Sequence, residues 1–169
     1  MFFGVSTLQT FHVLVSLVAI GTGVIVLYGL MSSQKMSLLT FIFLVTTLAT
    51  TLTGFLFPLN GFTPAVSVGI ISIFVLIAVF YARYGRRMTG RWRGVYVVTA
   101  VLSLYFNVFV LVAQMFQKVP ALKALAPNGS EPPFLAVQAM LLLLFLVAGY
   151  RAYRLFRPDR PAAAAARTA

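Results

Sequence analysis

The chain has 169 residues, of which 61% are hydrophobic and 9% are charged. A soluble domain averages about 45–50% apolar residues; here the excess lies in five long runs almost free of charge, which predicts membrane spans instead of a soluble core. The net charge of +11 would favour a nucleic-acid ligand in a soluble protein, but these basic residues flank the apolar runs, so we expect them to set membrane topology and expect no nucleic-acid partner.

Residues 1–9 contain no Lys or Arg, and the apolar run after them is too long for a cleavable signal peptide. Each of the five runs has about 20 residues or more, enough to cross a hydrocarbon core of about 30 Å. The predicted spans are residues 6–31, 37–57, 65–84, 92–119 and 134–156. The eight prolines lie at or outside the ends of these spans, so we expect regular helices. The predicted fold is an all-α integral membrane protein, a five-helix transmembrane bundle.

This bundle forms one domain, residues 1–157, and the Ala- and Arg-rich residues 158–169 are expected to be a disordered basic tail. The longest loop, residues 119–133, is too short for a domain and could hold one helical turn around residues 121–125. No internal repeat of the kind found in many transporters is evident.

The basic residues are shared unequally between the two sides of the predicted bundle. Eleven of the 13 Lys and Arg fall on one side: Lys35, Arg83, Arg86, Arg87, Arg91, Arg93, Arg151, Arg154, Arg157, Arg160 and Arg167. Only Lys118 and Lys123 fall on the other. The positive-inside rule places the richer side in the cytoplasm, which puts the N-terminus outside and the C-terminus inside. We expect the membrane to be a bacterial inner (plasma) membrane.

Small and polar residues line narrow faces of two predicted spans, at alternating spacings of three and four. The first face holds Gln9, His12, Ser16, Ala19 and Gly23, and the second holds Ala100, Ser103, Asn107, Val110, Gln114 and Gln117. The predicted topology gathers most of the polar side chains toward the outer leaflet. The candidate ligand-binding residues are therefore Gln9, His12, Thr50, Thr53, Asn107, Gln114, Gln117 and Gln138.

Two interpretations of this polar patch stay open. Its members could bond the helices to one another, since polar side chains and small residues join helices in lipid. Alternatively, they could form an outward-facing pocket for a ligand, a quinone head group, a haem or a partner protein. His12 is the only histidine, so bis-His haem ligation within one chain is excluded, whereas ligation with Met115 or Met140 is not.

Catalysis by this chain alone is not expected, and neither is a metal site. The chain has no Cys and only two acidic residues, which the predicted topology puts on opposite sides of the membrane. No charged residue lies deep within a span, which disfavours a proton-coupled mechanism. Three functions remain: a non-enzymatic membrane accessory protein or subunit, a quinone- or haem-binding redox protein, and an oligomeric channel or facilitator for a small solute.

The predicted cytoplasmic loop between the third and fourth spans is the most basic segment. Its arginines could face anionic lipid head groups, a contribution of about 1 kcal/mol per charge near the surface. This predicted lipid-facing cluster consists of Arg83, Arg86, Arg87, Arg91 and Arg93. The expected partners are thus the bilayer with its anionic lipids, and a larger membrane complex or a second copy of the chain.

Overall fold

The computed structural model describes residues 7–57 and 64–157, without the side chains of residues 64 and 65. The predicted tail, residues 158–169, lies outside this part. The helices are α1 (Thr7–Met31), α2 (Ser37–Gly54), α3 (Pro64–Phe80), α4 (Trp92–Lys118), α5 (Pro120–Leu125) and α6 (Pro132–Leu155), and a π-helical turn, η1 (Tyr81–Gly85), continues α3. Five of them are long and apolar enough to cross a membrane, which confirms the predicted helical spans.

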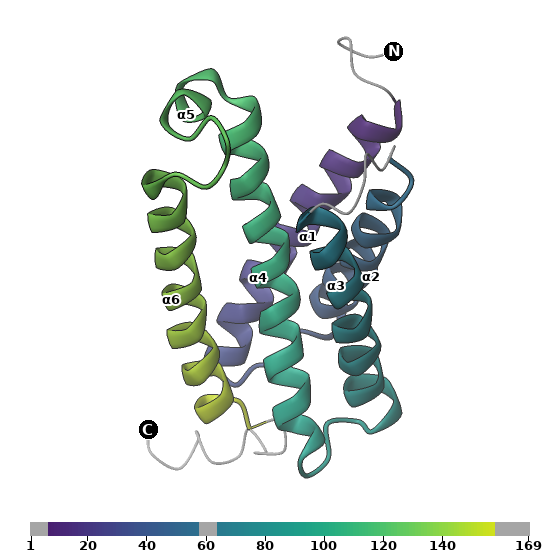
Figure 1. Cartoon of the computed structure of the whole chain (residues 1–169). Helices are drawn as coiled ribbons and strands as arrows, with labels where there is room; N and C mark the ends of the chain where they lie inside the picture. The colour runs from purple at the N-terminus through teal and green to yellow at the C-terminus, as the bar shows by residue number, and fades with distance from the viewer. Residues whose placement is uncertain (1–6, 58–63, 158–169) are drawn as a thin grey trace.

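The long helices run up and down, and α4 lies among the others (Figure 1). It packs against α1, α3 and α6, while α1 and α2 form a closely packed pair. The two ends of the bundle differ. The start of α1, the short helix α5 and the start of α6 lie at one end, called here the His12 end. The connection between α3 and α4 and the end of α6 lie at the other, called the basic end.

The apolar core is concentrated in the half of the bundle nearest the basic end. Its most deeply buried large side chains come from the start of α2, the end of α3, the start of α4 and the residue after α6: Phe43, Leu44, Leu76, Val79, Tyr96, Val97, Leu104 and Phe156. In lipid, helices gain little free energy from burying apolar surface. The close packing of these side chains therefore holds together the half of the bundle nearest the basic end. The half of the bundle nearest the His12 end carries most of the predicted polar patch.

The helix boundaries differ from the predicted spans by a few residues. Helix α2 ends at Gly54, three residues before the predicted end, and Pro132 and Pro133 form the first turn of α6 where the prediction put them outside it. Proline is tolerated in a first turn because its missing N–H has no partner within the helix there. The short turn predicted near residues 121–125 is confirmed as α5, which begins at Pro120.

Helix α6 is the least buried of the five. Within its most apolar window 11% is buried inside the bundle, against 22–33% for the other four helices. Leu143, Leu144 and Met140 are each more than half exposed. In a membrane this surface faces lipid or another protein.

Candidate functional site

The polar patch contains one direct side-chain bond between α1 and α2. His12 Nδ1 lies 2.8 Å from Thr53 Oγ1. The Thr53 hydroxyl also lies 2.7 Å from the Ala49 carbonyl on its own helix and donates to it. With that donation, the geometry fits the His12 tautomer that has its proton on Nδ1 and its lone pair on Nε2. The ring also meets Phe57 edge to face, with centroids 5.2 Å apart.

A second bond joins α4 to α2. Asn107 Nδ2 donates to Thr47 Oγ1 over 3.0 Å, and Thr47 is buried. Thr50 lies between Thr47 and Thr53 in the sequence, and its hydroxyl oxygen is buried without a hydrogen-bond partner. Thr47, Thr50 and Thr53 therefore form a row on α2 in which the first and last bind neighbouring helices and the middle one does not.

Gln138 joins a different pair of helices, α6 and α4. Its side-chain amide donates to the Phe109 carbonyl at 3.2 Å. The residue is buried, and its Oε1 has no partner. Gln138 is thus bonded to α4 and belongs to the α4–α6 contact, apart from the bonds that His12 and Asn107 make with α2.

The remaining candidates differ in exposure. Gln9 and Gln114 are half-buried, and Gln9 takes part in an interaction within the fold. Gln117 is exposed, because it lies in the last turn of α4, where the chain leads into α5. Within the described part of the chain, the residues of the predicted patch thus contribute cross-helix bonds at His12, Thr53, Asn107 and Gln138.

The potential of this site for metal or haem binding rests on His12 alone. Among residues 7–57 and 64–157, no group of three or more His, Cys, Asp or Glu side chains is close enough to hold a metal ion. Met115 and Met140, the open haem-ligand candidates, are 44% and 69% exposed on the bundle surface. Nδ1 of His12 is taken up by the contact with Thr53, so Nε2 is the ring nitrogen that would serve as a ligand or acceptor.

Arg83 departs from the predicted lipid-facing cluster, because it is only 8% exposed. Its Nη1 donates to the Tyr96 hydroxyl at 3.1 Å. Its guanidinium carbon lies 5.2 Å from the centre of the Tyr96 ring and 5.6 Å from that of Tyr84. Leu76 and Val79, seven and four residues before Arg83, are both buried and place Arg83 on the inner face of the helix, but the sequence of this apolar span does not show which face that is. Assigning this arginine to the lipid-facing cluster was therefore wrong.

The loop after Arg83 has a strained backbone. Arg87 and Met88 have φ values of 49° and 59°, a left-handed conformation that costs roughly 1–2 kcal/mol for each side chain larger than glycine. The Met88 N–H bonds back to the Ala82 carbonyl at 2.9 Å. The Met88 sulfur lies 3.8 Å from Arg83 Nη1. The strained turn therefore folds Met88 over the buried arginine.

Arg93 also has a structural role. Its Nη1 donates to the carbonyls of Tyr153 and Phe156, at 2.9 and 2.6 Å. These carbonyls end α6 and have no partner within the helix, so a cation there satisfies them and opposes the helix dipole. The other three members, Arg86, Arg87 and Arg91, are exposed, and their contact with lipid head groups stays a prediction.

Glu131 organises the turn before α6. Its carboxylate accepts the backbone N–H of Asn128 at 2.9 Å and that of Ser130 at 3.0 Å. These bonds, first among them the one from Asn128, lower the pKa of the carboxyl below its ordinary value of 4.5. The role of this acid is local, since it fixes the connection from α5 to α6.

Comparisons with protein-family models, with curated proteins and with solved structures give no match for this chain.

Proposed function

We propose that the chain is a non-enzymatic integral membrane protein that serves as an accessory protein or subunit. In this proposal it lies in a bacterial inner membrane, with its basic end in the cytoplasm and its His12 end outside. The main support is the use of the polar side chains: His12, Asn107 and Gln138 each bond to a neighbouring helix. Side chains that join helices are typical of a structural role.

The exposed apolar surface of α6 supports the proposal that the bundle binds a partner protein. Its residues Leu143, Leu144 and Met140 are 61%, 64% and 69% exposed, while its opposite side is held by α4 and α1. An apolar helix face of this kind can pack against another membrane protein without disturbing the bundle.

Co-purification tests the accessory role. The chain, tagged at its C-terminus and extracted in a mild detergent, should purify together with other membrane proteins in a fixed ratio. The same extraction in a harsh detergent, which strips such contacts, serves as the control. A chain that elutes alone as a monomer under both conditions would contradict the proposal.

A quinone- or haem-binding protein is the second candidate, and one observation favours it. The contact with Thr53 fits the His12 tautomer whose Nε2 is unprotonated, which is the form that binds a metal or accepts a hydrogen bond from a quinol. In this candidate His12 binds the group, and Thr53 fixes the orientation of the ring.

Paired threonine variants test the His12–Thr53 bond, and absorption spectroscopy separates the two candidates. Thr53→Val should lower the stability of the bundle by about 0.6–2 kcal/mol, the range for a polar bond between membrane helices. Thr51→Val is the matched control, because the Thr51 hydroxyl donates to the Thr47 carbonyl on its own helix. Unfolding in detergent measures this difference. A Soret band that is present in the purified wild type and absent in His12→Ala would instead establish haem binding.

A further inference from the structure

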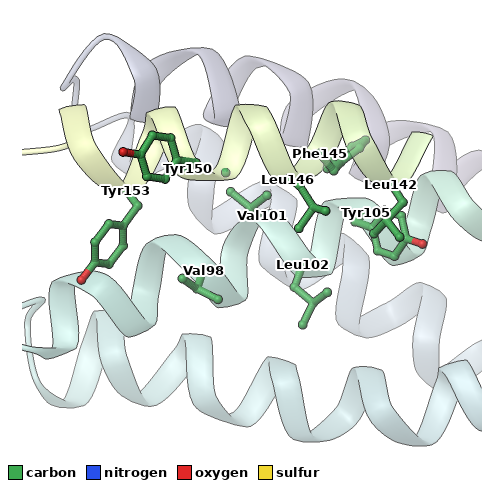
Figure 2. A pocket seen from close by; sticks show the side chains of 10 residues that line it. Val98, Val101, Leu102, Tyr105, Leu142, Phe145, Leu146, Tyr150 and Tyr153 are labelled. Atoms are coloured by element: carbon green, nitrogen blue, oxygen red, sulfur yellow. The ribbon is translucent and has the colours of Figure 1, made fainter. Parts of the chain in front are cut away.

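An apolar groove runs along the surface between α4 and α6 (Figure 2). Its volume is about 430 Å³. Val98 and Leu102 line it from α4, and Leu142, Leu146, Tyr150 and Tyr153 line it from α6. This groove is separate from the His12–Thr53 and Asn107–Thr47 bonds, and no pattern within a single span predicted it.

The length of the groove matches one leaflet. Between Leu142 and Tyr153 the α6 helix rises about 16 Å at about 1.5 Å per residue, and half of a hydrocarbon core of about 30 Å is about 15 Å. Tyr153 lies at the basic end, and Leu142 lies toward the middle of the helix (Figure 2). The groove therefore extends from the basic end to mid-membrane, the depth that one acyl chain occupies.

The shape of the groove also suits a chain that enters sideways from the bilayer. A Cβ atom on Gly149 would lie 3.3 Å from Val101 Cγ1, so the glycine allows close approach of the two helices and forms the floor. The walls stay open: Leu146 and Tyr150 are 58% and 63% exposed. An acyl chain that diffuses along the helix surface can therefore enter this open groove from the side.

Two arginines flank the end of the groove at Tyr150 and Tyr153. Arg154 Nη1 lies 3.4 Å from the Tyr150 hydroxyl oxygen, and the Arg93 guanidinium lies 5.2 Å from the centre of the Tyr153 ring. The one acidic residue among residues 7–57 and 64–157 is Glu131, which precedes α6 at the other end. Positive charge at this mouth is therefore not balanced by an acid in the described chain.

We propose that this groove binds one acyl chain of an anionic phospholipid, with the phosphate held between Arg154 and Arg93. Guanidinium groups offer N–H donors in the planar arrangement that phosphate oxygens accept. Anionic lipids give the cytoplasmic leaflet its negative surface potential, so this site rests on the orientation given in the proposed function. The apolar walls hold the chain, and the arginines select the charged head group.

Native mass spectrometry of the full chain in detergent tests the site. Phosphatidylglycerol should bind in preference to phosphatidylcholine with the same acyl chains. Leu146→Trp, which fills the groove from an exposed position, should remove the tightly retained lipid. Val147→Trp is the matched control, since this valine on the same helix is 60% exposed and does not line the groove. Equal lipid retention in both variants would overturn the site.

A second pair of variants tests whether the site prefers an anionic lipid head group. Arg154→Gln should reduce the preference for the anionic lipid about fivefold, the effect of one charge near the surface. Arg151→Gln removes a charge from the same end of α6, at an exposed residue outside the groove, and should leave the preference unchanged. Equal loss in both variants would show a diffuse charge effect and overturn the phosphate site, as would equal binding of the two lipids by the wild type.

Cysteine labelling tests the orientation separately from the lipid preference. The chain has no cysteine, so Thr89→Cys at the basic end and Ala124→Cys on α5 each introduce a single exposed thiol. In intact cells an impermeant reagent should label Ala124→Cys and spare Thr89→Cys. The reverse result would overturn the orientation and with it the cytoplasmic-leaflet site, while a preference for phosphatidylglycerol in detergent would still establish the groove itself.

Discussion

Tyr96→Phe should lower the free energy of unfolding by about 1.5–3 kcal/mol, the usual contribution of a hydrogen bond to a charged group. Tyr96 is 1% exposed, and its hydroxyl accepts the hydrogen bond from Arg83 Nη1 at 3.1 Å. The substitution keeps the ring and removes the acceptor. A buried guanidinium is then left with two aromatic faces and the Met88 sulfur as its neighbours.

Arg83→Met should cost less than Tyr96→Phe. It removes the buried cation itself, so the remaining cost is that of a neutral Tyr96 hydroxyl losing its donor, which is smaller than that of a buried charge losing its acceptor. The double variant should then be more stable than Tyr96→Phe alone, because it contains no buried charge that lacks an acceptor. Thermal unfolding in detergent, monitored by circular dichroism, measures the stability of all three variants.

Tyr28→Phe is the control for the loss of a tyrosine hydroxyl, since Tyr28 is 61% exposed on α1. It should unfold like the wild type. A double variant that loses as much stability as the two single variants combined would show that Arg83 and Tyr96 contribute independently, against the structure.

Gly23→Val should prevent normal packing of the bundle. A Cβ atom on Gly23 would lie 2.6 Å from Leu104 Cδ1 and 2.8 Å from Phe43 Cε2. Both neighbours are 1% exposed and have no free space to move into. Overpacking of this kind costs typically about 1–3 kcal/mol, and here the added side chain would separate α1 from both α2 and α4.

Gly21→Val provides the comparison on the same helix. No atom lies within 4 Å of a Cβ placed on Gly21, so this side chain would point away from the bundle. Size-exclusion chromatography in detergent should show a single peak for this variant and aggregated or unfolded material for Gly23→Val. Similar profiles for the two would contradict the contact between α1, α2 and α4 at Gly23.

Much of the helical structure can be predicted from the sequence, because each span depends on a local property, its run of apolar residues. A run of about 20 apolar residues predicts a membrane helix whatever its neighbours are, and five helices of that length and composition are present. Part of the helix packing could also be predicted from the sequence. Ala19 and Gly23, on the small-residue face of the first span, are buried, as are Ala100 and Ser103 on the fourth.

The candidate sites could be predicted only in part, since they depend on which helices meet. The spacing of Gln117 puts it on the same face as Asn107, but the end of α4 leads into α5 and leaves the side chain exposed. Charge alone grouped Arg83 with the exposed arginines, although Tyr96 lies 13 residues further along the chain and provides a buried acceptor. The groove is formed jointly by α4 and α6, and neither helix carries a sequence signal for it.

The position of α6 at the end of the bundle has a consequence for biogenesis. Ribosomes deliver helices in chain order, so α1 to α4 enter the membrane before α6 is complete, and they include both helices that α6 contacts most, α4 and α1. The wall that carries Leu146, Tyr150 and Tyr153 is therefore the last to arrive. A truncated product that lacks α6 lacks one wall of the groove, so lipid retention there shows that α6 has been inserted beside α4.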